Sequence, residues 1–337
     1  MIRLYLLGFL ILIGACNPSN SDSSASTSSH TMGEVVHVYS TRKQAVDSIL
    51  YQKFEAATGI QVVLTEGDEK SLWNQLEEQG NESEVDVLIG WEVAFLERAV
   101  QHELLQPIKK EFLDEHVPLA YRQANRFWFG LGYRATLLVY NPEISIAGLE
   151  TYEDLMEKQW ASQLVYANNQ SFLAAMIANR GDENTLAWLQ ALAKHQTIEG
   201  IENSLMALEA LEKGWANIAL VESHELASYW HENPAAQQKM AVHLLNQSTS
   251  GIHVNLSGAA VLQNAKHLEN AVQLLIFLTG KEAQDVLTNQ GFEYPIYPGA
   301  TPNLLLQSWG DFQKDPLDFT FLYQNQKKAK ELLGLVD

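Results

Sequence analysis

The sequence predicts an α/β protein of two lobes, each a mostly parallel sheet flanked by helices. Three observations support this fold class. Strand-like and helix-like segments alternate from residue 35 onward, the alternation resumes after residue 127, and 337 residues suffice for two ordinary domains. The composition, 46% apolar and 19% charged, is that of a globular protein. We expect the chain to leave the first lobe near Arg134 and to return near Asn255.

The N-terminus has the pattern of an export signal that ends at a cysteine. A mostly apolar run leads to Ile13-Gly14-Ala15-Cys16, which resembles a bacterial lipobox. We therefore expect residues 1–15 to be a signal peptide and Cys16 to carry lipid. The alternative is a transmembrane anchor, but the run is shorter than the roughly 20 residues of a spanning helix. Residues 16–33 are rich in serine and lack apolar periodicity, which predicts a disordered tether.

The first sheet is predicted from three strands with a helix between each pair. The expected strands are 35–40, 61–64 and 85–89, and the expected helices run through 46–54 and 72–76. Gly59 marks the end of the first helix. Ligands bind beyond the carboxyl ends of such parallel strands, so residues 40–44 and 90–92 are expected at one crevice.

The middle of the chain repeats this alternation. Strand-like segments 127–134 and 137–140 stop at the turn signal Asn141-Pro142. Further strands are expected at 164–166, 218–221 and 251–262, helices at 152–160, 173–178, 185–193 and 204–213, and a helical C-terminus from Leu304 onward.

Charge and motif content exclude several classes of function. Lysine and arginine number 22 against 41 acidic residues, a net charge of −19, which argues against nucleic acid as a partner. The single cysteine cannot form an intramolecular disulfide. The chain has no nucleophile elbow, zinc-protease motif or phosphate-binding loop, so we do not expect an enzyme.

Separate segments spread from about residue 35 to residue 333 agree in order and spacing with one known family. They are Val38-Tyr39-Ser40-Thr41-Arg42, Phe54-Glu55-Ala56-Ala57-Thr58-Gly59-Ile60, Val85-Asp86-Val87-Leu88-Ile89, Trp128-Phe129-Gly130-Leu131 with Arg134, Val139-Tyr140-Asn141, Thr151-Tyr152-Glu153-Asp154-Leu155, His253-Val254-Asn255-Leu256-Ser257-Gly258-Ala259, Glu293-Tyr294-Pro295 and Ser308-Trp309-Gly310. In these segments the chain resembles the ferric-ion-binding proteins of bacterial ABC importers.

The resemblance implies a type 2 periplasmic binding protein, with two lobes joined by two hinge strands and a solute bound between them. It implies lobe 1 at residues 34–134 plus 256–303 and lobe 2 at residues 135–255 plus 304–337. The expected partners are an ABC permease and its ATPase, a small solute or metal ion, and the membrane through the lipid anchor only. We expect a monomer.

The positions of the family's iron ligands hold other residues in this chain. The family's Ser-Arg-His-Tyr corresponds to Thr41-Arg42-Lys43-Gln44, its tyrosine before Asn-Gln-Ser to Asn168, and its tyrosine pair to His224-Glu225. Each tyrosine expected at the metal is thus replaced. Glu92 stands where a family carboxylate often does, and Arg134 keeps the basic position associated with the site.

Two chemistries remain open for the site. Without phenolates it loses its main selectivity for Fe³⁺, and Glu92, His224 and Glu225 would suit a divalent metal such as Zn²⁺, Mn²⁺ or Fe²⁺. Lys43 instead points to an anion, either a metal chelate or an organic acid. We expect an anion to be bound by the cations Arg42, Lys43 and Arg134 and the amides Gln44, Asn168 and Asn169. The ring of Trp91 would pack against an organic ligand. No cofactor is expected beyond Fe³⁺ or a divalent metal as the transported ligand.

The sequence thus predicts an extracytoplasmic solute-binding lipoprotein of an ABC importer. A first alternative is a lipoprotein that senses a ligand for a membrane histidine kinase. A second is a hydrolase or transferase on the same fold, which would need a catalytic constellation that the sequence lacks.

Overall fold

The computed structural model describes residues 34–198, 200–316 and 318–336. The predicted signal peptide (1–15), Cys16 and the predicted tether (16–33) lie outside the described residues and stay predictions. No helix among the described residues is long and apolar enough to cross a membrane.

Strands and helices alternate through most of the chain. The strands are β1 (Val35–Ser40), β2 (Gln61–Glu66), β3 (Val87–Gly90), β4 (Trp128–Tyr140), β5 (Leu164–Tyr166), β6 (Ile218–Glu222), β7 (Ala241–His243), β8 (Val254–Val261) and β9 (Tyr294–Pro295). The helices are α1 (Ala45–Thr58), α2 (Glu69–Gln79), α3 (Val93–Gln101), α4 (Glu111–His116), α5 (Gln170–Arg180), α6 (Asp182–His195), α7 (Ser204–Glu212), α8 (Ser223–Glu232), α9 (Leu268–Thr279), α10 (Lys281–Gln290), α11 (Leu304–Ser308) and α12 (Phe319–Leu333).

The strands follow the order β2-β1-β3-β8-β4-β6-β5, with β7 and β9 pairing with β4. The part around β1, β2 and β3 is called the first lobe, and the part around β5 and β6 the second lobe. β1 is parallel to both β2 and β3, which confirms the predicted run of three strands and two helices. Helix α1 ends at Gly59, whose φ of 75° places it in the left-handed region that glycine tolerates best.

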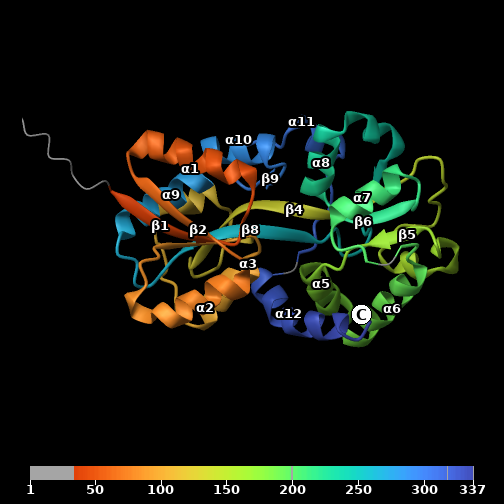
Figure 1. Ribbon diagram of the computed structural model, residues 1–337, viewed down its shortest axis with the longest axis horizontal. Coiled ribbons are helices and arrows are strands. Elements are labelled where there is room, and N and C mark those ends of the chain that lie inside the picture. Colours follow the sequence, from red (N-terminus) through yellow and green to blue (C-terminus); the bar gives the residue numbers. More distant parts are fainter. Residues whose placement is uncertain (1–33, 199, 317, 337) are drawn as a thin grey trace, which may run out of the picture. The chain divides into compact units, whose positions relative to one another are not determined.

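Two long strands, β4 and β8, join the lobes (Figure 1). They pair antiparallel from Trp128 opposite Ala260 to Ala135 opposite Val254, and β4 continues to Tyr140, where it pairs with β6 and β7. The two-lobed α/β fold with two hinge strands is therefore confirmed. The prediction of separate strands at 127–134 and 137–140 was wrong, because β4 is continuous and only its register shifts, between Gly130 and Gly132.

The second lobe differs from the predicted mostly parallel sheet. β5 and β6 are parallel, but β6 and β7 both run antiparallel to β4. The reason is that the hinge strand itself forms the middle of this sheet, and it enters from the first lobe in the opposite direction.

Two further predictions of helices need correction. Residues 152–160 form two short 3₁₀ turns rather than a helix. The Asp154 carboxylate accepts the backbone N–H groups of Glu150 and Thr151, and such local bonds compete with an α-helix. The C-terminal part is not continuously helical, since α11 and α12 are separated by a segment that contains Gly310 and Pro316.

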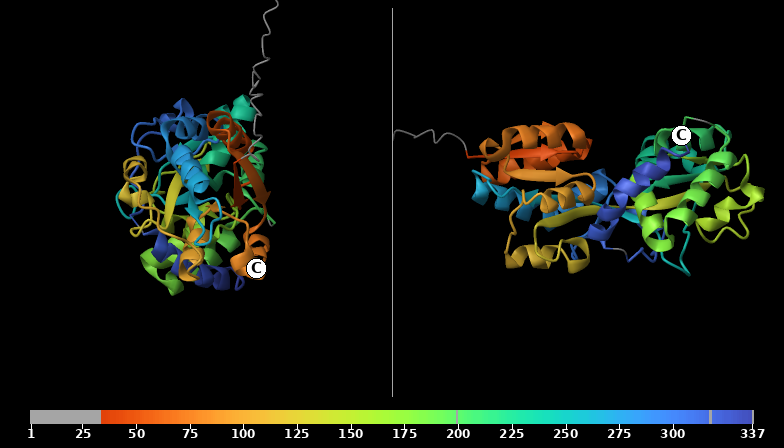
Figure 2. Two further views of the ribbon diagram at one scale, coloured as in Figure 1. Left: turned by 90° about the vertical axis from the view of Figure 1, so that its left-hand side faces the viewer. Right: turned by 90° about the horizontal axis from the view of Figure 1, so that it is seen from below.

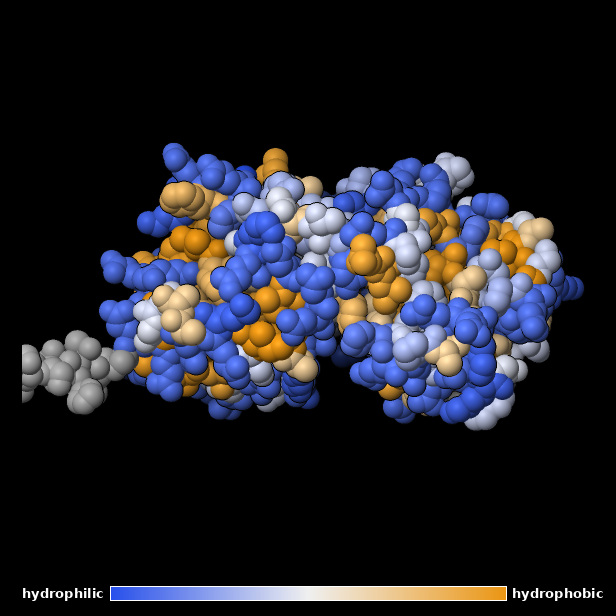
Figure 3. Space-filling view, turned by 90° about the horizontal axis from the view of Figure 1, so that it is seen from above, coloured by the Kyte–Doolittle hydropathy of each residue, from blue (hydrophilic) through white to orange (hydrophobic). Residues whose placement is uncertain are grey.

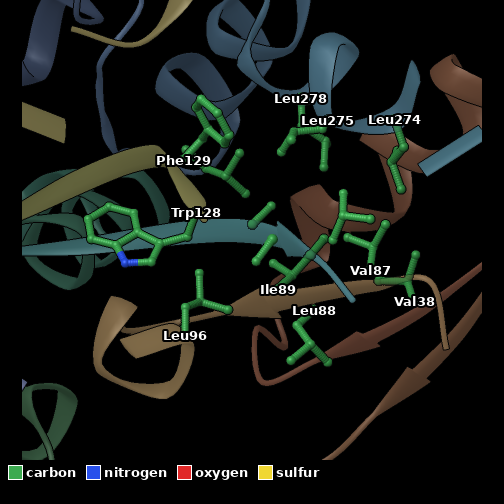
Figure 4. Packing of buried hydrophobic residues seen from close by; sticks show 14 of the residues in the cluster. Val38, Val87, Leu88, Ile89, Leu96, Trp128, Phe129, Leu274, Leu275 and Leu278 are labelled. Atoms are coloured by element: carbon green, nitrogen blue, oxygen red, sulfur yellow. The ribbon is translucent and has the colours of Figure 1, made fainter. Parts of the chain in front are cut away.

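The core of the first lobe packs on both faces of its sheet (Figure 4). Leu274, Leu275 and Leu278 of α9 lie on one side of the strands, and Leu96 of α3 lies on the other. Separate clusters of buried residues fill the second lobe. On the face shown in Figure 3, hydrophilic residues predominate and apolar residues gather in small groups.

Candidate functional site

The carboxyl ends of β1 and β3 meet at one edge of the first lobe, as their parallel pairing requires. The Thr41 N–H donates to the Ile89 carbonyl at 2.9 Å, and the Trp91 N–H donates to Thr41 Oγ1 at 2.8 Å. Residues 40–44 and 90–92 therefore lie together, as predicted.

The second lobe presents the carboxyl ends of β5 and β6. Asn169 caps α5, because its side chain accepts the Phe172 N–H at 2.9 Å. Asn169 Nδ2 also donates to Glu222 Oε1 at 3.4 Å, which ties the loop after β5 to the last residue of β6.

A cavity of about 240 Å³ lies between these strand ends and takes its lining from both lobes. Its lining residues are Trp91, Glu92, Thr136, Tyr166, Ala167, Asn168, Asn169, Gln170, Glu202, Asn203, Ser204, Leu220, Val221, Glu222 and Glu225. A neighbouring cavity of about 330 Å³ is lined by Thr41, Lys43, Gly67, Asp68, Glu69, Phe95 and, again, Trp91 and Glu92. Trp91 and Glu92 thus line both cavities.

The Glu92 carboxylate is held from two sides. Asn255 Nδ2 donates to Oε1 at 2.9 Å, and Gln326 Nε2 donates to Oε2 at 3.2 Å. Burial raises the pKa of Glu92, and the nearby Glu222 carboxylate raises it further.

Arg134 organises the centre of the site. Its guanidinium lies over the Trp91 ring, 3.6 Å from the ring centroid, and Nη2 donates to the Trp91 carbonyl at 3.1 Å. Nε donates to Glu222 Oε2 at 3.3 Å. Burial acts to raise the pKa of Glu222, but the charge and hydrogen bond of Arg134, together with the nearby His224 and His253, hold that pKa below the usual value.

Arg42 was predicted to contact a solute, and the structure corrects this prediction. Arg42 is 2% exposed and pairs with Asp47 and Glu293, each at 2.8 Å. Its Nη1 also donates to Ser257 Oγ at 3.0 Å. Arg42 is therefore a structural anchor in this structure, because buried carboxylates already occupy its charge.

The predicted metal set of Glu92, His224 and Glu225 is not assembled. Within residues 34–198, 200–316 and 318–336, no three or more His, Cys, Asp or Glu side chains are grouped so that they could hold a metal ion. His224 is buried with its ring edge-on to Trp91, and burial lowers its pKa to about 4. His224 is therefore neutral at pH 7.

The other predicted residues occupy different places around the site. Lys43 lines the neighbouring cavity with Thr41. Gln44 caps α1, and its N–H is 3.4 Å from Asp47 Oδ2. Asn168 and Glu225 line the first cavity, where burial raises the pKa of Glu225.

Sequence reasoning missed several residues of the site. Glu222 ends β6, two residues before His224, which came from the family resemblance together with Glu225. The strand-end rule, applied to this strand as it was to the first sheet, would have found Glu222. Tyr166 and Thr136 line the cavity from strands. Gln326, on the C-terminal helix, carries no local signal that points to the site.

The carboxylates give the first cavity an affinity for positive charge. Glu92, Glu202, Glu222 and Glu225 line it, and the described lining includes no lysine or arginine. Arg134 is engaged by Glu222 and stacked on Trp91. This arrangement favours a cation over an anion as the bound solute.

The buried His253, directly before β8, predicts a pH-dependent loss of stability. Burial lowers its pKa to about 4; Glu222 opposes that shift and Arg134 adds to it. In the unfolded chain this histidine binds the proton with the ordinary pKa of about 6.5, so acidification favours unfolding between pH 6.5 and about pH 4. We expect His253→Gln to reduce the loss of unfolding free energy between about pH 7.5 and about pH 5 by ~2 kcal/mol.

Urea unfolding at both pH values checks this expectation. His231→Gln, at an exposed histidine on α8, is the control and should leave the pH dependence unchanged. The same pH dependence in His253→Gln and the native chain would contradict the assignment.

The sequence matches a family model described as bacterial extracellular solute-binding protein over residues 50–317. It is 32% identical over 314 residues to Iron uptake protein A1 of Synechocystis sp., which covers 90% of this chain and 87% of that protein. It is 27% identical over 303 residues to the Fe(3+)-binding periplasmic protein of Serratia marcescens, covering 88% of each.

Solved structures of ferric-binding and iron-bound proteins have a similar fold. The ferric binding protein from Campylobacter jejuni superposes with a TM-score of 0.84 at 25% identity, covering 89% of this chain and 99% of that chain. A Trichodesmium protein in complex with iron and citrate superposes with a TM-score of 0.81 at 29% identity, covering 90% and 99%.

Proposed function

Because the chain belongs to the family of bacterial extracellular solute-binding proteins, we propose that it binds iron outside the cytoplasm as the solute-binding component of an ABC importer. The identity to Iron uptake protein A1 over most of both chains supports iron as the cargo. The names of the Serratia and Campylobacter proteins support ferric iron in particular.

The carboxylate-lined cavity between the lobes is the observation that carries this proposal. Fe³⁺ is a hard cation that favours anionic oxygen, and Glu92, Glu222 and Glu225 supply it in place of the absent phenolates. Tyr166 adds one phenol to the lining. Since these groups do not form a closed ligand set in this structure, the cargo would draw them together as it binds.

The two lobes are expected to close on the solute, because residues of both lobes line the cavity. Trp91 and Glu92 come from the first lobe, and most of the other lining residues come from the second. A solute that contacts both sides favours the closed arrangement by its higher affinity for that state. A permease and its ATPase would recognise the closed form.

The proposal includes the remaining sequence predictions. Cys16 would carry the lipid anchor after removal of residues 1–15, and residues 16–33 would tether the folded part to the membrane. The lobes would comprise residues 34–134 plus 256–303 and 135–255 plus 304–337. The protein would act as a monomer.

Ligand-dependent stabilisation of the metal-stripped full chain tests the cargo. We expect ferric citrate to raise the unfolding free energy by ~2.7 kcal/mol at about 100 times its dissociation constant, because the ligand binds only the folded state. Citrate alone is the control and should have little effect. Stabilisation only by Fe²⁺, Mn²⁺ or Zn²⁺ would show that the cargo is a divalent metal and not ferric iron. Stabilisation by citrate alone would contradict a cationic cargo.

A further inference from the structure

The C-terminal helix α12 lies against both lobes. Figures 1 and 2 show it crossing from the first lobe, near α3, to α5 and α6 of the second. At its start, Thr320 Oγ1 donates to the buried Glu97 of α3 at 2.9 Å. Near its end, Ala329 and Leu332 are buried in the core of the second lobe. Phe319, the first residue of α12, is partly buried against the core of the first lobe, edge-on to Trp128. The fully buried apolar residues near the end of α12 thus anchor it in the second lobe, and its start contacts the first.

Gln326, in the middle of α12, connects the two halves of the solute site. Its Nε2 donates to Glu92 Oε2 at 3.2 Å, on the first-lobe side. Its backbone carbonyl accepts a hydrogen bond from Gln170 Nε2 at 3.0 Å, on the second-lobe side, and Gln170 lines the cavity.

We propose that Gln326 is a positioning residue of the solute site, which orients the Glu92 carboxylate toward the cavity and does so only when α12 holds the lobes in this arrangement. The inference rests on the proposed function, because it names a residue that serves the same site.

The hydrogen bonds of Glu92 carry the proposal. Each carboxylate oxygen has one amide donor, Asn255 on Oε1 and Gln326 on Oε2. Asn255 lies in the hinge strand β8, where it pairs with Arg134 of β4. Gln326 is the donor that travels with the second lobe. A carboxylate held at both oxygens is oriented before the solute arrives, and this lowers the cost of binding.

Gln326→Met tests the inference because it keeps the length of the side chain and removes the donor. Gln324→Met is the matched control, since Gln324 is an exposed glutamine on the same helix. We expect Gln326→Met to weaken the apparent affinity of the full chain for ferric citrate about tenfold, and Gln324→Met to leave it unchanged. Gln326→His, which retains an N–H donor, should recover part of the loss. Equal affinities for Gln326→Met and the native chain would overturn the inference.

A ligand-free measurement separates this inference from the proposed function. We expect amide hydrogen exchange to rise around Trp91 and Glu92 in Gln326→Met but not in Gln324→Met. If the native chain binds no iron but the two variants still differ in exchange, the proposal of iron as cargo is wrong and the contact between Gln326 and Glu92 is supported. Unchanged exchange in Gln326→Met would overturn the contact, whatever the cargo.

Discussion

Replacing Arg42 with methionine is expected to destabilise the protein by ~3–5 kcal/mol, because it leaves buried carboxylates without their cation. Asp47 is 3% exposed and Glu293 is 1% exposed, and both pair with Arg42 at 2.8 Å. Glu293 keeps a longer contact with Arg134, at 3.6 Å, whereas no other cation is seen to pair with Asp47 among the described residues. Urea or guanidinium unfolding of the native chain and Arg42→Met measures the difference.

The loss should shrink as the pH falls. Burial raises the pKa of Glu293, and Arg42 and Arg134 together hold it below the usual value. Without Arg42 the effect of burial on this pKa is less opposed, so protonation of Glu293 relieves part of the penalty at low pH. Lys53→Met, which breaks the exposed pair of Lys53 with Glu282, is the control and should cost less than about 1 kcal/mol. A similar small cost for Arg42→Met would show that Arg42 is not a structural anchor.

The first lobe could be predicted from sequence because its elements carry regular local patterns. The strand at 35–40, the helix that ends at Gly59 and the strand at 61–64 all follow from periodicity and one glycine. Helix α3 was not predicted, although Val93, Leu96 and Ala99 recur in it at helical spacing. Helices α9 and α10 were also not predicted.

Strand ends predicted the site residues after β1 and β3, the family resemblance supplied those after β5 and β6, and contacts between distant parts of the chain were missed. Residues after β1, β3, β5 and β6 gather at the cavities because parallel strands end together. Glu293, 251 residues from Arg42, pairs with Arg42 at 2.8 Å and lies 3.6 Å from Arg134, and both arginines are buried. Gln326 reaches Glu92 across 234 residues. Such contacts arise from tertiary packing, which no local pattern encodes.

Glu222→Gln is expected to weaken the binding of a cationic solute by about tenfold to a hundredfold, because it removes one negative charge from the cavity wall. Glu222 ends β6, lines the cavity and lies close enough to Glu92 to raise the pKa of that carboxyl group. Glutamine keeps an oxygen that accepts the hydrogen bond from Arg134, so the geometry around Trp91 should survive. Isothermal titration with ferric citrate, and with whichever metal stabilises the native chain, measures the change.

The sign of the change in affinity decides the charge of the cargo. A cation loses attraction in Glu222→Gln, whereas an anionic chelate or organic acid loses repulsion. Tighter binding in Glu222→Gln would therefore contradict a cationic cargo. It would support an anionic solute, the alternative that Lys43 suggested from the sequence. Glu232→Gln, on the exposed side of α8, removes the same charge away from the cavity and should change the affinity little. Equal effects of the two variants would mean that net charge, and not the cavity wall, controls binding.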